Sequence, residues 1–345
     1  MTVEVKMPLV SFCLLSYNKA QYVAEAVRGA LCQTYEPLEI LIVDDCSTDG
    51  SQQVIEEVLK ESRVRGEKRN VTFICNKVNR GLVRNAEYVY SLAKGELLVQ
   101  AGCDDVSEPE RVARLATAWV KDGRRALTVA SGSVNIDLNG LTVGPGPRIC
   151  CYGPHGAVMA WHRLVMTSFP AVLRSDGFDD EIFAFRARVL AHLTDTQFIS
   201  DLFAPDQLVR YRIGCGVSAI HRREFRSGDV RCLRARGASH EQALIDLELM
   251  RSRMTVEKYE GLKRECEQRL ALTRNRLILA TASSLRARYR AFMKVKSPRL
   301  FSPLNLQYVC YLLPQFLGDP LLGLYLWIRE RVRALRNRRS TTCAF

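Results

Sequence analysis

Apolar runs alternate with stretches of helical periodicity over the first hundred residues. Four short apolar runs are typical of strands, at residues 9–15, 38–43, 71–75 and 96–100. Apolar residues recur at helical spacing between them, at residues 22–31, 52–59 and 83–93. Strands that alternate with helices at this spacing indicate βαβ crossovers. We therefore expect an α/β fold built on a mostly parallel, mixed sheet with helices on both faces.

Aspartate pairs directly follow the second and the fourth predicted strand. These are Asp44-Asp45 and Asp104-Asp105. Ligands of open α/β sheets bind at the carboxyl ends of the strands, so both pairs are expected in one cleft. Carboxylates are hard oxygen ligands that suit Mg²⁺ or Mn²⁺, and such ions neutralise phosphate oxygens. For Asp104-Asp105, the alternative is a capping role at the helix that begins at Pro109.

Two further loops are predicted at the same edge. Tyr17 could stack on a nucleobase, with Ser16 and Asn18 beside it, and Asp45 could accept hydrogen bonds from a base or ribose. The alternatives are a half-buried loop aromatic and a turn or cap formed by Asp45 with Ser47. A third loop contributes Asn79 and Arg84, and a guanidinium can pair with phosphate, although each arginine could equally be an exposed one without a partner.

Composition limits the class of protein. A chain of 345 residues with 47% apolar residues can form a globular domain and an appendage. Its twelve cysteines are scattered without a CxxC pair, and no signal peptide is seen, which favours reduced thiols in the cytoplasm and makes a zinc site improbable. Twelve basic and two acidic residues lie between Arg286 and Arg339, and they account for ten of the thirteen excess positive charges. This local excess does not indicate a nucleic-acid-binding protein.

The C-terminal third differs from the rest of the chain. Residues 240–294 mix apolar and charged positions as long amphipathic helices do. The most apolar stretch, 308–328, is interrupted by Pro314, Asp319 and Pro320 and fits poorly as a membrane-spanning helix. We expect a catalytic domain at 7–230, helices at 231–299 and an apolar, basic segment at 300–345.

Basic residues flank that apolar segment, which also holds aromatic residues. The combination favours peripheral attachment to the inner face of the cytoplasmic membrane. The alternatives are a helical hairpin packed on the catalytic domain and a homo-oligomer that associates through residues 243–278.

Together these residues resemble a known family. The strings VSFCLLSYNKAQYVAEAVRGALCQTYEPLEILIVDDCSTDGS, NRGLVRNAEYVYSLAKGELL and CDDVSEPERV occur in the order found in family 2 inverting glycosyltransferases of the GT-A fold, especially the SpsA-like bacterial members. The resemblance covers about residues 7–220. It implies a UDP-sugar donor with Tyr17 and Asp45 at the base, Asp104 near the ribose, and Asp105 with Asp104 on the metal. The other nucleotide-binding residues that we expect on these loops are Ser16, Asn18, Asp44, Asn79 and Arg84.

An inverting transfer also needs a carboxylate base for the acceptor hydroxyl. The family pattern resembles Asp179-Asp180 followed by Arg186 and then by LVRYR at 208–212. We expect Asp180 to be the base, with Asp179 its rival and Arg186 in the sugar or acceptor region. The alternative is a solvated acidic turn that also includes Asp176.

Upstream, the segment HGAVMAW resembles the family's glycine-containing stretch beneath the sugar site. Gly156 would allow a close backbone approach there. His155 could be a ligand or a surface-loop histidine.

Two positions depart from the pattern. Gly102 stands where many relatives have the first carboxylate of Asp-x-Asp, and Gly214 stands where a histidine often completes the metal shell. The expected activity is metal-assisted transfer of a sugar to a lipid-linked or lipopolysaccharide-type acceptor in cell-envelope polysaccharide synthesis. The two departures motivate an alternative, a non-catalytic nucleotide-binding scaffold with a degenerate domain.

Overall fold

The structure is a computed structural model of the chain. It describes residues 6–66, 68–146, 155–194, 197–215 and 225–295, together with isolated positions between 312 and 331. The predicted C-terminal segment 300–345 therefore lies almost entirely outside the described residues.

The first half of the sheet is parallel, as predicted. Strands β3, β2, β1 and β4 lie side by side in that order, each parallel to its neighbour. Their bounds are Val10–Ser16 (β1), Leu38–Asp44 (β2), Asn70–Cys75 (β3) and Leu97–Gly102 (β4). The connecting helices are Val23–Leu31 (α1), Ser51–Val64 (α2) and Leu82–Leu92 (α3).

The second half of the sheet is mixed. Strand β8 runs antiparallel to both β4 and β6, while β9 runs parallel to β6 and antiparallel to the short β5, and β7 pairs with β6. These strands are Val106–Ser107 (β5), Ala126–Ile136 (β6), Thr142–Pro145 (β7), Met159–His162 (β8) and Ile199–Arg212 (β9). The helical elements here are Arg111–Lys121 (α4), Gly156–Val158 (η1), Leu164–Thr167 (α5) and Asp179–Ala191 (α6).

Both faces of the sheet are buried, which explains the continuous apolar runs of the parallel strands. Successive side chains of a strand point to opposite faces. In β1, Phe12 and Leu14 join the core beneath α1, α2 and α4, whereas Cys13 and Leu15 join the core beneath α3 and α6.

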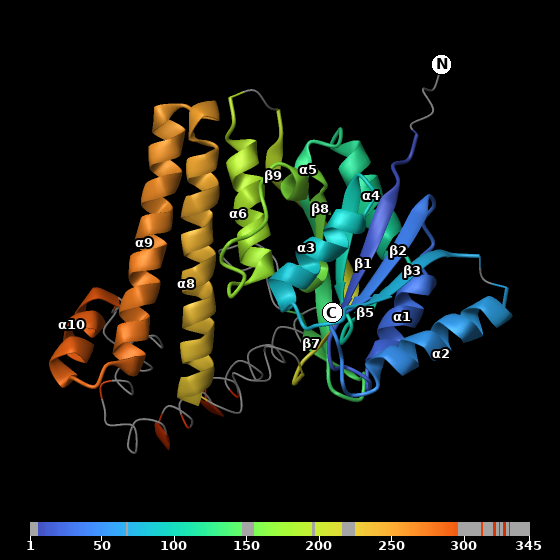
Figure 1. Cartoon of the computed structure of the whole chain (residues 1–345), viewed down its shortest axis with the longest axis horizontal. Coiled ribbons are helices and arrows are strands. Elements are labelled where there is room, and N and C mark those ends of the chain that lie inside the picture. The colour runs from blue at the N-terminus through green and yellow to red at the C-terminus, as the bar shows by residue number, and fades with distance from the viewer. Residues whose placement is uncertain are drawn as a thin grey trace, which may run out of the picture.

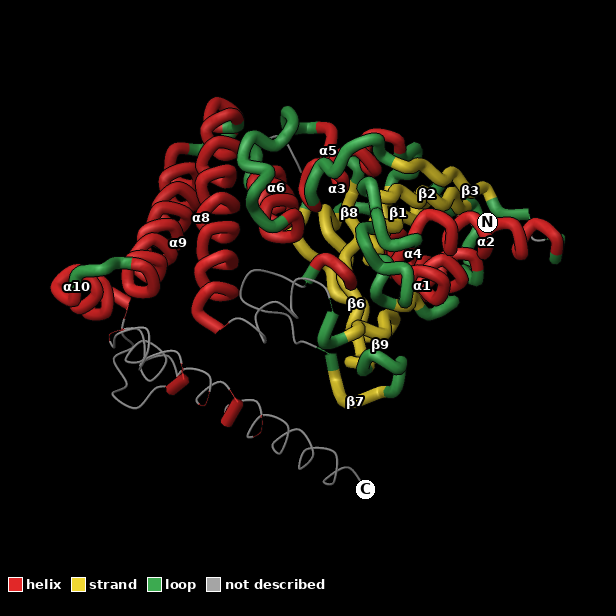
Figure 2. The backbone as a smooth tube through the Cα atoms, turned by 60° about the horizontal axis from the view of Figure 1, so that its bottom comes forward, coloured by secondary structure: helices red, strands yellow, loops and turns green. Residues whose placement is uncertain are grey.

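A pair of long helices continues the second of these cores. Helix α8 (Phe225–Leu249) packs against α6 and is followed by η2 (Arg251–Arg253), α9 (Val256–Thr281) and α10 (Leu285–Val295). Figure 1 shows α6, α8 and α9 side by side at one end of the sheet, and Figure 2 shows the same layering from below. Leu247 of α8 and Leu262 of α9 belong to the same buried cluster as Phe183 of α6.

The predicted amphipathic helices are thus present, and they share a core with the α/β domain. The expected boundary at residue 230 falls inside α8. None of the helices in the described ranges combines the length and apolar character that crossing a membrane requires.

Candidate active site

Three strand ends meet at one edge of the sheet. Ser16 at the end of β1 is in register with Asp44 at the end of β2, and Leu15 is in register with Gly102 at the end of β4. The loops that carry the first two aspartate pairs therefore flank the loop after β1. This edge is the crevice in which α/β sheets bind ligands.

Asp44 organises the loop that follows β2. Its buried carboxylate accepts hydrogen bonds from Ser16 Oγ (2.9 Å), from the backbone N–H and Oγ of Ser47 (2.8 and 2.6 Å) and from Gln52 Nε2 (2.7 Å). Four donors saturate the two carboxylate oxygens. The side chains of Asp44 and Ser16 are thus engaged within the protein, where they shape the loop, and their expected contact with nucleotide stays a prediction.

Asn18 ties the loop after β1 to the loop after β2. Its backbone N–H donates to Ser47 Oγ (2.8 Å), and its Oδ1 accepts from the backbone N–H of Thr48 (2.9 Å). Its φ of 48° lies in the left-handed region, which asparagine tolerates better than most residues. The next loop is thereby held beside Tyr17.

Asp45 shapes the third loop. Oδ1 accepts from Asn76 Nδ2 (2.8 Å) and from the backbone N–H of Arg80 (2.9 Å), and Oδ2 accepts from the backbone N–H of Gly81 (2.9 Å). The carboxylate thus draws the start of α3 toward the end of β2. Tyr17 is 47% exposed, which leaves its ring available for stacking.

Asn79 and Arg84 lie on this third loop and the first turn of α3. Asn79 is exposed and its Oδ1 accepts from the backbone N–H of Gly81 (2.9 Å). Arg84 pairs with Glu87 (3.1 Å) along a cleft of about 510 Å³ between α3 and α5. The alternative of a partnerless arginine is therefore wrong for Arg84.

The second aspartate pair follows β4. Asp104 forms an ion pair with Lys19 Nζ (3.3 Å), and Asp105 Oδ1 accepts from the backbone N–H of Arg212 (2.8 Å). A Cβ placed on Gly102 would lie 3.0 Å from Asp104 Oδ1 and 3.6 Å from Asp105 Oδ2. Both carboxylates therefore reach the same small space beside Gly102.

The two carboxylates of this pair repel each other. Burial, followed by the negative charge of Asp104, raises the pKa of Asp105 well above its ordinary value.

The capping alternative for Asp104 and Asp105 is wrong, because α4 begins after Glu110 and neither carboxylate bonds to the first turn of that helix.

Two adjacent carboxylates suit a divalent cation. Mg²⁺ is commonly held by one or two carboxylates together with substrate phosphates and water. In the part of the chain that the structure describes, no group of three or more His, Cys, Asp or Glu side chains is arranged to hold a metal ion. The donor set at Asp104 and Asp105 thus fits an ion whose remaining ligands come from a diphosphate and water.

The third aspartate pair begins helix α6. Asp179 Oδ2 accepts from Gln100 Nε2 (2.7 Å). Asp180 accepts from the backbone N–H groups of Gly156 (3.1 Å) and Glu181 (2.9 Å). Asp179 is buried and Asp180 is only partly exposed, so the solvated-turn alternative is wrong for this pair, whereas Asp176 is exposed.

Asp179 and Asp180 differ in what surrounds their carboxyl groups. Burial, followed by the charge of Asp180, raises the pKa of Asp179 to about 7. Burial also raises the pKa of Asp180, but two backbone N–H groups stabilise its charged form. Asp180 is the more accessible of the two.

His155 and Gly156 lie next to Asp180. The His155 ring packs against Tyr211, with ring centroids 4.7 Å apart, and burial lowers its pKa to about 4, so the ring is neutral at pH 7. It is not a surface-loop histidine. A Cβ on Gly156 would stand 2.7 Å from Gln100 Nε2, which explains the need for glycine.

Arg186 contacts helix α8. Its buried guanidinium donates to both carboxylate oxygens of Asp246 (2.8 and 3.1 Å) and to the carbonyl of Pro170 (2.9 Å). These hydrogen bonds hold α6 on α8. Arg186 also lines the cleft of about 510 Å³ along which Arg84 lies, so its place in the sugar or acceptor region stays a prediction.

Sequence reasoning missed three residues that join the site together. Lys19 pairs with Asp104, and Gln100 pairs with Asp179. The buried Arg111 donates to the carbonyls of Gln100 (2.8 Å) and Ala157 (2.7 Å), beside both acidic pairs. Lys19 lies within a recognised loop, but no spacing rule marks the other two.

Comparisons with known proteins agree with this geometry. Residues 11–174 match the family model described as glycosyl transferase family 2. An uncharacterized glycosyltransferase of Haemophilus influenzae is 30% identical over 115 residues, 33% of this chain and 34% of that protein. The chondroitin synthase of Pasteurella multocida is 30% identical over 181 residues, 51% of this chain and 18% of that protein. The matches thus span 34% and 18% of the length of these two relatives.

Among solved structures, the mannosyltransferase PcManGT of Pyrobaculum calidifontis, in complex with GDP-Man and Mn²⁺, has the same fold. The TM-score is 0.55 at 19% identity, and the match covers 96% of this chain and 88% of that one. Its fold and the family match agree with the GT-A architecture. Residues 11–174 of the chain are therefore similar to glycosyl transferase family 2.

Proposed function

We propose that the chain is an inverting glycosyltransferase that moves a sugar from a nucleotide sugar, UDP-linked, to an acceptor hydroxyl. The observation that carries this proposal is the link between two acidic pairs. Gln100 of β4 holds Asp179 at the start of α6, and two residues beyond β4 lie Asp104 and Asp105. Strand β4 thus connects the pair that holds the proposed base with the pair that we propose to face the diphosphate.

Asp180 is the proposed base. It takes the proton of the acceptor hydroxyl as that oxygen attacks the anomeric carbon, and the nucleoside diphosphate leaves from the opposite face. Its partial exposure, and the two backbone N–H groups that stabilise its charged form, favour it over the buried Asp179. Asp179 is proposed to hold a proton and thereby limit the repulsion between the two carboxyl groups.

Asp104 and Asp105 would hold Mg²⁺ or Mn²⁺, which when bound neutralises charge that develops on the diphosphate. The chemistry of the donor set supports this assignment, and so does the relative that was solved with GDP-Man and Mn²⁺. Tyr17 is proposed to stack on the base and Asp104 to approach the ribose, with Asp45 holding the loop that closes this side.

The test is release of UDP or GDP from a panel of nucleotide sugars, with Mn²⁺ or Mg²⁺ and with a chelator. Asp180→Asn should reduce transfer by about 10²-fold or more, since a positioned base contributes that much. Its affinity for the nucleotide should stay unchanged. Asp176→Asn, on the same segment but exposed, is the matched control. Full turnover by Asp180→Asn would exclude this base, and nucleotide binding without transfer from any donor would favour a scaffold.

We also propose that the acceptor is lipid-linked or of lipopolysaccharide type and is met at a membrane surface. Helix α10 supports this. Leu285, Tyr289 and Met293 are 65%, 55% and 44% exposed and recur every four residues, which places them on one face. Exposed basic residues recur one position later, at Arg286, Arg290 and Lys294. An apolar stripe beside a basic stripe suits a surface of anionic lipid.

Sedimentation with vesicles tests this surface. Wild type should bind vesicles that contain an anionic phospholipid and not neutral ones, and Tyr289→Ser with Met293→Ser should weaken binding. Val64→Ser on the exposed end of α2 is the control. If the stripe instead joins two copies of the chain, light scattering will show a dimer that the same substitutions dissociate.

A further inference from the structure

Helix α8 holds the helix that carries the proposed base. The segment that matches the family model ends at residue 174, before Asp179 and Asp180. Helix α6 is covered by α8, which lies directly beside it (Figure 1). The question is whether α8 merely buries α6 or also sets the position of its first turn.

Ser239 of α8 contacts the backbone immediately before α6. Its Oγ accepts from the backbone N–H of Phe178 (2.9 Å), which precedes Asp179. A Cβ on Gly177 would lie 2.9 Å from Ser239 Oγ and 3.0 Å from Ser239 N. The two backbones approach so closely that only glycine fits, so a small movement of α8 would be passed to the first turn of α6.

Arg236 lies one turn before Ser239 and contacts that first turn from the same side. Its Nε donates to Glu181 Oε1 (2.8 Å), the side chain next to Asp180. Its positive charge lowers the pKa of Asp180 against the opposing effect of burial. Arg236 therefore acts on both the position and the pKa of the proposed base.

The same face of α8 fixes the approach to α6. Gln242 Oε1 accepts from the backbone N–H groups of Leu173 (2.8 Å) and Arg174 (2.9 Å), and its Nε2 donates to Asp246 Oδ1 (2.9 Å). Ser239, Gln242 and Asp246 are all buried. Apolar packing alone would allow α8 to slide along α6, whereas these directional bonds fix one register.

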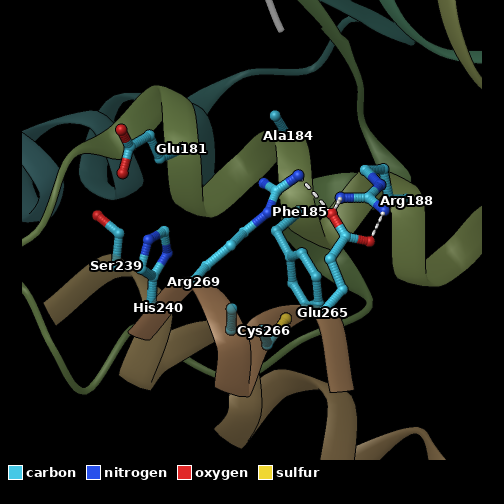
Figure 3. Close-up of a pocket in the computed structure, with 10 residues that line it drawn as sticks. Glu181, Ala184, Phe185, Arg188, Ser239, His240, Glu265, Cys266 and Arg269 are labelled. Atoms are coloured by element: carbon cyan, nitrogen blue, oxygen red, sulfur yellow. Dashed lines mark hydrogen bonds and ion pairs between the residues drawn. The ribbon is translucent and has the colours of Figure 1, made fainter. Parts of the chain in front are cut away.

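One small cavity lies between the helices of this interface. The cavity between α6, α8 and α9 holds about 30 Å³, enough for one or two water molecules. Figure 3 shows Glu181 facing Ser239 and His240 at one end, and the Arg188, Glu265 and Arg269 ion pairs at the other. Contact between the helices, not a bound molecule, is what this region provides.

We propose that Arg236 and Ser239 are positioning residues for Asp180, so that α8 is part of the catalytic machinery. The inference rests on the proposed function. The charged and titratable groups that act on Asp180 are Asp179 and Glu181 of α6, Arg236 of α8 and Tyr90 of α3. Only Arg236 among them is a cation.

Arg236→Gln should lower kcat by about 10- to 100-fold, because small displacements of a catalytic group carry such costs. KM for the donor should stay within about twofold, as expected when an interaction acts mainly in the transition state. The acidic limb of the pH profile of kcat should move to higher pH, since losing the cation raises the pKa of Asp180. Arg236→Lys should return the acidic limb of the pH profile to its wild-type position. Arg234→Gln, exposed on the same helix, is the matched control.

Ser239→Ala provides a second, milder variant. Hydrogen exchange at the amides of residues 177–182 should accelerate in Ser239→Ala and not in Arg234→Gln. Suppose that wild type transfers sugar and that Arg236→Gln and Ser239→Ala keep the wild-type rate, acidic limb and hydrogen exchange. The positioning role is then wrong, while the enzyme assignment stands. If wild type transfers no sugar but exchange still accelerates, the function is wrong while the docking by α8 stands. A lower rate with an unmoved limb in Arg236→Gln would overturn the charge effect.

Discussion

Gln100 donates a 2.7 Å hydrogen bond from Nε2 to Asp179 Oδ2 and so joins strand β4 to helix α6. The side-chain amide of Gln100 cannot flip, because its Oε1 accepts from Tyr90 Oη and from Trp161 Nε1, each at 2.8 Å. The backbone of Gln100 leads directly to Asp104. One side chain therefore couples the positions of the two acidic pairs.

Gln100→Leu should destabilise the fold. The substitution leaves the Tyr90 hydroxyl, the Trp161 indole N–H and Asp179 without this partner inside the core. We expect a loss of about 3 kcal/mol or more, since each unsatisfied buried group costs about 1–3 kcal/mol. Urea unfolding measures this loss, with Gln53→Leu on the exposed face of α2 as the control. A loss no larger than that of the control would show that the network contributes little.

Asp179 should make stability depend on pH. Its folded pKa is raised to about 7, above its value in the unfolded chain, so its contribution is fully present below the unfolded pKa and is lost as pH rises through about 7. Between pH 5 and 8, wild type should lose stability relative to Asp179→Asn, by about 3 kcal/mol at most. Denaturation midpoints at several pH values test this. The control is Asp176→Asn. Arg174 lowers the pKa of the Asp176 carboxyl, so this variant should keep the wild-type slope over this range.

The parallel half of the fold could be predicted because its strands are buried on both faces. Strands β1, β2 and β4 are buried almost throughout, and such strands appear as unbroken apolar runs. Strand β9 could not be found in this way. Its side chains vary between exposed and buried without strict alternation, and the register of its pairing with β6 shifts.

The loops could be predicted, but their partners could not. An aspartate pair after a strand marks a crevice, whatever contacts each carboxylate later makes. Gln100 lies 79 residues from Asp179, and Arg186 lies 60 residues from Asp246, so neither contact leaves a spacing signal. Arg186 was assigned to the sugar region from its distance to Asp180 along the chain, yet its place on α6 turns it toward α8.

Lys19 should compete with a divalent cation for Asp104. Its ammonium lies 3.3 Å from Asp104 Oδ2. The neighbouring Asp105 carboxyl has a raised pKa. Lys19→Met removes a positive charge from this pair, so Mn²⁺ alone should bind about 10-fold more tightly, a gain that an effective dielectric near 20 allows. Electron paramagnetic resonance of free Mn²⁺ measures the affinity. Lys77→Met, in an exposed loop, should match wild type. Weaker binding of Mn²⁺ to Lys19→Met would contradict the competition.

The buried pair between Arg186 and Asp246 should act on stability and not on nucleotide binding. Each single change, Arg186→Met or Asp246→Leu, leaves a charge buried without its partner and should cost about 3–5 kcal/mol. The double variant should lose much less than the sum, because no unpaired charge remains.

Urea unfolding of the four proteins in this cycle measures the coupling. Arg28→Met at the exposed Arg28–Glu61 pair is the control, and its cost should stay below about 1 kcal/mol. Nucleotide affinity of each folded variant should equal that of wild type, since the guanidinium donates only to α8 and to Pro170 in the hydrogen bonds that fix it. Loss of nucleotide affinity in a stably folded Arg186→Met would place this arginine at the sugar site.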